Sequence, residues 1–144
     1  MKKLSGGVVL ALVVGACSSI APVPIHSGEV CFRCRRVIVD TRIAAQAIDG
    51  GLVSNFRSAG CAAKYLVDHP NDTSAVFVTD YQTGKMFPAQ RAFFVPTLNR
   101  DNGEKDYVAF VARSAADAEA FSRRTQWLTW SAVKAAEQAA ERGN

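Results

Sequence analysis

The stretch IAAQAIDGGLVSNFRSAGCAAKYLVD, residues 43–68, decides the fold. Its first half contains two runs of strand-forming residues, 43–48 and 52–56, separated by the tripeptide Asp-Gly-Gly at 49–51. An Asp-Gly pair between two apolar runs is a strong signal for a β-hairpin. We therefore expect two antiparallel strands joined by a tight turn.

The second half of this stretch predicts a helix that follows the hairpin directly. Ser58 is a suitable N-cap, and residues 59–68 continue to His69-Pro70, where the proline disfavours further helix. The largely apolar run 74–79 then predicts another strand. Together these segments form a β-β-α-β unit.

The remainder of the chain repeats this order of elements. We expect a strand at 92–95, a turn at 101–103, a strand at 107–112, a helix at 115–124 capped by Ser114 and a strand at 126–130. The pattern predicts one small α+β domain built from two similar β-β-α-β halves. The halves resemble each other in pattern and not in residue identity.

The N-terminus has the three parts of a secretory signal. Basic Lys2 and Lys3 precede an apolar run at 8–14, and small residues at 15–16 come just before Cys17. The run is too short to cross a bilayer, which needs about 20 apolar residues. The motif resembles a lipobox, so we expect a lipoprotein precursor in which Cys17 becomes the lipidated first residue. An ordinary signal peptide, with Cys17 as a plain thiol, is the alternative.

These features divide the chain into four parts. Residues 1–16 are the expected signal peptide, 17–29 a lipidated flexible tether rich in Ser and Pro, 30–131 the α+β domain, and 132–144 a C-terminal helical tail capped by Ser131. The lipid would anchor the protein to the periplasmic face of a bacterial membrane. Ser18 is not aspartate, which in similar lipoproteins favours the outer membrane.

The net charge gives no indication of nucleic-acid binding. Removing residues 1–16 takes away Lys2 and Lys3 and leaves 15 basic against 13 acidic residues, a formal charge of +2. The basic residues are scattered, and an exported protein does not meet nucleic acid.

The cysteines are the most informative residues. If Cys17 is lipidated, three remain, and an odd number cannot form a closed set of disulfides. Cys31 and Cys34 form a CxxC pair, and Cys61 lies on the predicted helix. Three thiolates suit copper(I), whereas zinc prefers a fourth ligand. The alternative is a Cys31–Cys34 disulfide with Cys61 as a small buried apolar residue.

The surroundings of the cysteines favour thiolates. Cys61 occupies the third position after the Ser58 cap, where the helix N-terminus lowers a thiol pKa. Four arginines crowd the same motifs: Arg33, Arg35, Arg36 and Arg57. His26 in the tether and Met86 are possible additional ligands. His69 lies about 12 Å beyond Cys61 along a regular helix, too far to share one ion.

An enzyme is not expected. No histidine base stands beside a serine nucleophile, and neither paired carboxylates nor a phosphate-binding glycine loop is present. A thiol oxidoreductase is also disfavoured, because the β-branched residues 37–39 predict a strand directly after the CxxC, where such enzymes begin a helix.

Several motifs, in this order, resemble the NosL family of lipoproteins, which act as copper chaperones for nitrous oxide reductase. The resemblance covers residues 17–133. The matching segments are the lipobox, the CxxC, Phe56-Arg57-Ser58, Val78-Thr79-Asp80, Ala92-Phe93-Phe94-Val95 and residues 111–121. The resemblance implies a membrane-anchored copper chaperone that delivers metal to a metalloenzyme or an envelope-complex partner.

The chain departs from the family pattern at the expected metal site. The family usually has C-x-x-C-G-M, whereas Arg35 and Arg36 stand at the last two positions here, and a second family methionine has no counterpart near Asn102-Gly103. Cys61 is similar to a cysteine of the YHS/TRASH metal-binding modules. We therefore expect a three-cysteine copper site, with a non-catalytic structural or interaction lipoprotein, held by a disulfide or a zinc ion, as the alternative.

Overall fold

The computed structural model describes residues 19–100 and 102–143. Cys17 and the expected signal peptide lie outside these residues. The strands are β1 (Ala45–Asp49), β2 (Leu52–Phe56), β3 (Ala75–Thr79), β4 (Met86–Pro88), β5 (Phe93–Leu98) and β6 (Lys105–Phe110). The α-helices are α1 (Ala59–Asp68), α2 (Arg113–Ser122) and α3 (Trp130–Arg142). None of the helices in the described part is long and apolar enough to cross a membrane.

The hairpin forms as predicted. Strands β1 and β2 pair antiparallel, with Ala45 opposite Phe56 and Asp49 opposite Leu52. Gly50 and Gly51 adopt φ values of 53° and 87°. Positive φ at both central residues matches the right-handed twist of the strands and is readily adopted by glycine.

The predicted helix and the strand after it are also confirmed. The Ser58 side chain caps α1 by accepting a hydrogen bond from the Cys61 N–H at 3.1 Å. Strand β3 returns antiparallel to β1 and gives a sheet in the order β2-β1-β3-β4. Strand β4 was not predicted from the sequence. It is a short edge strand that ends in Pro88, a residue tolerated at sheet edges.

The second half differs from the first. Strands β5 and β6 form a separate two-stranded sheet. The strand expected at 126–130 is wrong, because only one bridge forms there, between Phe94 and Leu128. The Thr129 side chain accepts a hydrogen bond from the Ala132 N–H and starts α3 at Trp130. The helical cap thus ends the extended segment before it can pair further.

Two smaller expectations are also corrected. Helix α2 starts at Arg113, after Ala112, so Ser114 lies inside the helix and is not its cap. The strand expected at 37–39 is a single bridge between Val30 and Val37. The predicted alternation is present, since Ile38 is buried between exposed neighbours. Ile38 exchanges backbone hydrogen bonds with Gly28 and Glu29, but the pairing does not extend beyond the one bridge.

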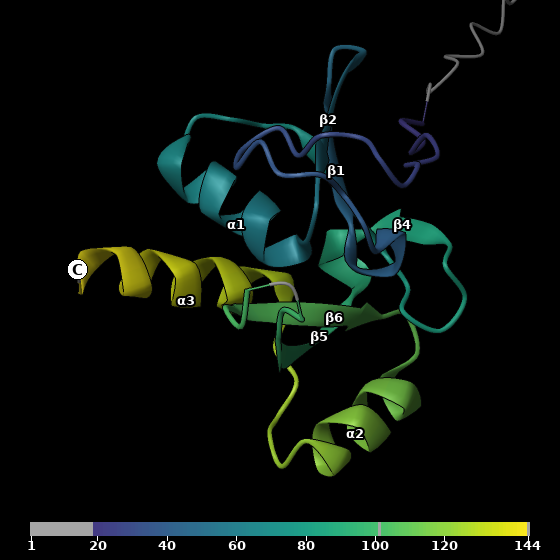
Figure 1. The fold of residues 1–144 in the computed structure, drawn as a ribbon, viewed down its shortest axis with the longest axis vertical. Coiled ribbons are helices and arrows are strands. Elements are labelled where there is room, and N and C mark those ends of the chain that lie inside the picture. The colour runs from purple at the N-terminus through teal and green to yellow at the C-terminus, as the bar shows by residue number, and fades with distance from the viewer. Residues whose placement is uncertain (1–18, 101, 144) are drawn as a thin grey trace, which may run out of the picture.

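The two-stranded sheet separates two apolar clusters. Phe94, Tyr107 and Ala109 face the main core, while Val95 and Val108 belong to a smaller core with α2. This alternation follows from the two-residue period of a strand. In Figure 1, α1 and α3 lie on one side of β5 and β6, and α2 lies on the other.

A polar contact joins three elements on the α3 side of the core. The buried Tyr107 hydroxyl of β6 donates a hydrogen bond to the Glu137 carboxylate of α3 at 3.0 Å. Lys64 of α1 pairs with the same carboxylate at 3.8 Å. Burial, followed by the negative charge of Glu137, raises the pKa of the Tyr107 phenol. The C-terminal helix expected at 132–144 is therefore tied to the domain through a buried side chain. It begins at Trp130 with Thr129 as its cap, and not after Ser131.

Candidate metal centre

A tight loop before the hairpin carries the first two cysteines. The Cys31 N–H donates to the Arg36 carbonyl at 2.9 Å, and the Arg35 N–H donates to the Cys31 carbonyl at 3.0 Å. Arg35 has φ 61°, in the left-handed region that favours glycine. This turn folds the chain back, so that the side chain of Cys34 comes to lie near that of Cys31.

The cysteine loop, residues 30–37, is held against the edge of the sheet. The Phe32 N–H donates to the Asn55 carbonyl of β2 at 2.7 Å. The Phe32 ring meets Phe56 and Tyr65 edge-on, with centroids 6.2 and 5.5 Å away. Because Phe56 precedes α1 and Tyr65 lies on it, these contacts place the loop directly beside the helix that carries Cys61.

The structure brings the three cysteines together. The sulfur atoms of Cys31, Cys34 and Cys61 all lie within 4.8 Å of one another, and none is in a disulfide. The Cys31 and Cys61 sulfurs are 3.4 Å apart. Three sulfurs bound to one ion at about 2.3 Å would lie about 4 Å apart. The donor set therefore fits a soft metal ion with little movement.

The two buried thiols, Cys31 and Cys61, have pKa values shifted in opposite directions. The hydrogen bond from Cys61, aided by the backbone N–H groups of Cys34 and Arg57 and opposed by burial, lowers the pKa of Cys31 to about 4. The same hydrogen bond, together with burial, raises the pKa of Cys61. One thiolate supported by a neighbouring thiol is thus the favoured state of the pair.

Only part of the cluster faces solvent. Cys31 is fully buried and Cys61 is 7% exposed, while Cys34 is half-buried. A hollow of about 260 Å³ is lined by Cys34 and Cys61 but not by Cys31. We call this hollow the mouth of the cluster. A metal ion or a reagent reaches the sulfurs from this side.

Asp106 positions the helix that carries Cys61. Its Oδ1 atom accepts hydrogen bonds from the N–H groups of Gly60 at 3.2 Å and Tyr107 at 2.9 Å. Asn99 donates to its Oδ2 atom at 3.3 Å. A carboxylate at a helix N-terminus is favourable because it faces the positive end of the helix dipole. Nothing local in the sequence indicates this contact, which joins residues 46 positions apart.

The other candidate ligands lie elsewhere. The His26 ring is exposed and sits beside the Glu29 carboxylate at 3.2 Å. Met86 lies on β4, at the sheet edge opposite β2 and its bound cysteine loop. Among the described residues, the three cysteines are the only possible metal ligands of the His, Cys, Asp or Glu type that converge in one group.

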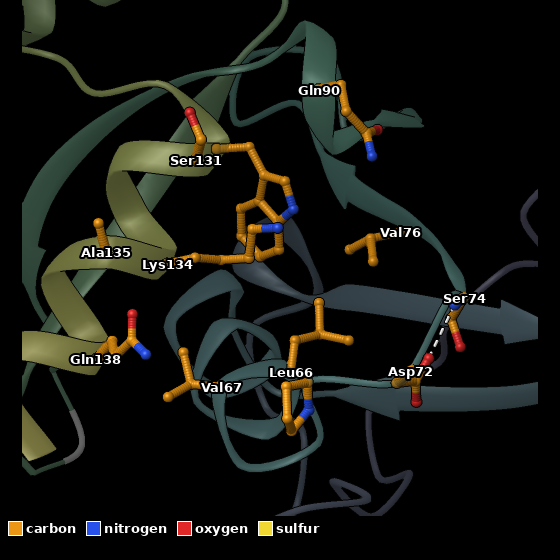
Figure 2. Close-up of a pocket in the computed structure, with 12 residues that line it drawn as sticks. Leu66, Val67, Asp72, Ser74, Val76, Gln90, Ser131, Lys134, Ala135 and Gln138 are labelled. Atoms are coloured by element: carbon orange, nitrogen blue, oxygen red, sulfur yellow. Dashed lines mark hydrogen bonds between the residues drawn. The ribbon is translucent and has the colours of Figure 1, made fainter.

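A larger hollow, of about 450 Å³, lies between α1, α3 and β3 (Figure 2). Its ionisable side chains are Asp72, which accepts a hydrogen bond from the Ser74 N–H at 2.8 Å, and Lys134. Neither cysteine nor histidine lines it. The metal-binding chemistry of the described residues therefore gathers at the cysteine cluster.

A comparison with solved structures shows which known fold this chain resembles. The crystal structure of the copper chaperone NosL from Shewanella denitrificans matches with a TM-score of 0.60 over 71% of this chain and 87% of that chain. The two proteins share a fold. Sequence identity is 20%, and neither a family model nor a curated protein matches the sequence. The likeness to NosL thus confirms the small α+β domain and concerns the fold alone.

Gly60→Ala should destabilise the protein, because its Cβ would lie 2.8 Å from the buried Asp106 Oδ1 atom. We expect a loss of about 2 kcal/mol in the free energy of unfolding, measured by urea denaturation. Gly143→Ala is the control: its Cβ would meet nothing closer than 3.7 Å. Equal stability of the two variants would show that Asp106 moves away from the new Cβ atom with no loss in the free energy of unfolding.

Iodoacetamide should modify Cys34 before the other two cysteines of the cluster. Cys31 and Cys61 are buried, so the reagent cannot reach their sulfur atoms, and this holds for the thiol and the thiolate forms alike. Peptide mass spectrometry of the reduced, metal-free protein would follow each site, and we expect about a tenfold faster reaction at Cys34. In urea the difference should vanish. Reaction at Cys31 as fast as at Cys34 in the native protein would contradict this arrangement.

Proposed function

We propose that this protein is a metal-delivery lipoprotein, a copper(I) chaperone that holds its cargo through Cys31, Cys34 and Cys61. The single observation that carries this proposal is the convergence of the three sulfurs within 4.8 Å. Trigonal thiolate sites prefer soft copper(I). The NosL-like fold adds support, since the solved neighbour is described as a copper chaperone.

Zinc is the less favoured cargo. It takes four ligands in most structural sites, commonly with a histidine among them. The described part of the chain brings no histidine to the cluster, and His26 is engaged with Glu29. A fourth ligand for zinc would have to come from water or a partner through the mouth.

The close approach of Cys31 and Cys61 supports a second candidate function. Sulfurs 3.4 Å apart need little movement to form a disulfide in an oxidising compartment. The protein would then be a structural or interaction lipoprotein of an envelope complex. Non-reducing mass spectrometry distinguishes the two: a loss of 2 Da that survives incubation with metal supports the disulfide.

The proposed site of action is the periplasmic face of a bacterial membrane, with Cys17 lipidated and the outer membrane as the destination. The sequence pattern at residues 1–18 supports this placement. Its partner would be a metalloenzyme or an envelope complex that accepts the ion. No catalysis is proposed, because a chaperone passes its cargo on without changing it.

An anaerobic copper(I) titration of the reduced protein against a chromophoric chelator tests the metal role. We expect one ion per chain and about a 100-fold weaker affinity in Cys61→Ser, which corresponds to about 2.7 kcal/mol. His26→Ala and Met86→Leu are the controls and should bind as tightly as the wild type. No uptake, or equal uptake by a triple Cys→Ser variant, would overturn the proposal.

Lipidation at Cys17 has its own test. When the full chain is produced in a Gram-negative host, the protein should fractionate with membranes, because its acyl chains insert into the bilayer. Cys17→Ser should shift it out of the membrane fraction, while Cys34→Ser should not. A wild-type protein in the soluble envelope fraction, with an unmodified Cys17 by mass spectrometry, would contradict the anchor.

A further inference from the structure

The mouth of the cluster is the route by which an ion enters or leaves. Cys31 is fully buried, whereas Cys34 and Cys61 line the hollow. A protein that exchanges metal with this site therefore has to bring its own ligand into the mouth. The side chains around the mouth determine which partner can do so.

Five of the eleven residues that line the mouth are cationic. They come from the cysteine loop, from the segment 57–64 that leads into α1 and from β6, which lie far apart in the sequence. The cations are Arg33, Arg36, Arg57, Lys64 and Lys105. Two carboxylates, Glu104 and Asp106, also line the mouth. Asp106 accepts hydrogen bonds from backbone N–H groups, as described above, and the formal charges around the mouth are five positive against two negative.

Internal ion pairs engage three of the five cations. Arg33 pairs with Asp68 at 3.2 Å, Arg57 with Glu104 at 3.6 Å and Lys64 with Glu137 at 3.8 Å. Arg36 and Lys105 are exposed, and neither is in an ion pair among the described residues, although the Lys105 Nζ atom lies 5.8 Å from the centre of the Tyr107 ring. These two side chains are available for carboxylates from outside the molecule.

The mouth continues into a groove. A second hollow, of about 430 Å³, shares Arg33, Lys64, Glu104 and Lys105 with the mouth and extends along α3 past Ala136 and Ala140. Glu137 and Glu141 also line this part, where they pair with Lys64 and Arg33, so the excess of positive charge lies at the mouth. A small anion would occupy the mouth alone. A continuous groove beside the metal site instead suits an extended segment of polypeptide.

We infer that the mouth docks the acidic residues of a polypeptide segment from the protein that exchanges metal with this one. Arg36 and Lys105 contact its carboxylates, and the uncharged remainder of the segment lies along the groove. The inference rests on the proposed metal role. Charge complementarity raises the rate of encounter and selects the partner more than it adds affinity.

The exchange step balances without an oxidant or reductant. An incoming cysteine thiol of the partner forms a bond from its sulfur to copper(I) at the open side. The bond between copper and Cys34 breaks, and Cys34 takes up the proton that the incoming thiol releases. Copper stays in the +1 state, and Cys31 and Cys61 hold it until further partner ligands replace them.

Transfer to two synthetic acceptor peptides tests this inference on the full chain in detergent. Both peptides carry a Cys-x-x-Cys, flanked in one by four aspartates and in the other by four lysines. At low salt we expect copper(I) to reach the acidic peptide about tenfold faster, and we expect 1 M salt to remove the difference.

The variant and its control carry equal changes in charge. Arg36→Glu/Lys105→Glu should lose or reverse the preference, measured as the ratio of the transfer rates to the two peptides. Lys85→Glu/Arg91→Glu, which alters two cations outside the mouth, should keep it. Equal rates with the two peptides, or equal effects of the two double variants, would overturn the docking inference.

A separate measurement keeps this test distinct from that of the metal role. Fluorescence anisotropy of the acidic peptide with the reduced, metal-free protein reports docking even if no copper(I) is taken up. Binding that is lost in Arg36→Glu/Lys105→Glu and retained in the control supports the surface. Absence of binding, or displacement by millimolar inorganic phosphate as effective as that by the unlabelled peptide, would overturn it.

Discussion

The carboxylate of Asp106 is the contact on which the rest of the site depends. It fixes the first turn of α1 against β6, with Gly60 allowing the close approach. That turn carries Cys61, and the same helix offers Tyr65 to the cysteine loop. A buried carboxylate with three hydrogen-bond donors is costly to displace. The position of the Cys61 sulfur thus depends on Asp106, which belongs to the second half of the chain, where none of the three cysteines lies.

The local parts of the fold could be predicted from the sequence, and the distant contacts could not. Asp-Gly-Gly identified the hairpin because only a few residues tolerate two consecutive positive φ angles, and Ser58 identified the start of α1. The segment 126–130 was mistaken for a strand because its apolar residues do not reveal that Thr129 caps a helix. Short edge pairing, as in β4, leaves too few residues for a recognisable period.

The candidate site shows the same division. The CxxC and the helical position of Cys61 were sufficient to predict that three sulfurs belong together. The arginines beside the cysteines could be read from the sequence, but the opposite wall of the mouth could not. Glu104, Lys105 and Asp106 come from the start of β6 and the residue before it, more than forty residues after Cys61. Arg35 is a further case, since a left-handed residue of this kind is ordinarily glycine, and its guanidinium lies 5.8 Å from the Phe32 ring. The sequence alone does not show that this stacking accompanies the strained turn.

The cysteine loop also has a consequence for solubility. Strand β2 is an outer strand of the four-stranded sheet, and an uncovered outer strand is a template for pairing with another chain. The hydrogen bond from Phe32 to Asn55, with the aromatic packing around it, covers part of that edge. If the loop detached, it would expose Cys31 and Cys34 to solvent and leave the edge of β2 free to pair with a strand of another chain. The segment that supplies two of the three sulfurs therefore also protects the protein against aggregation.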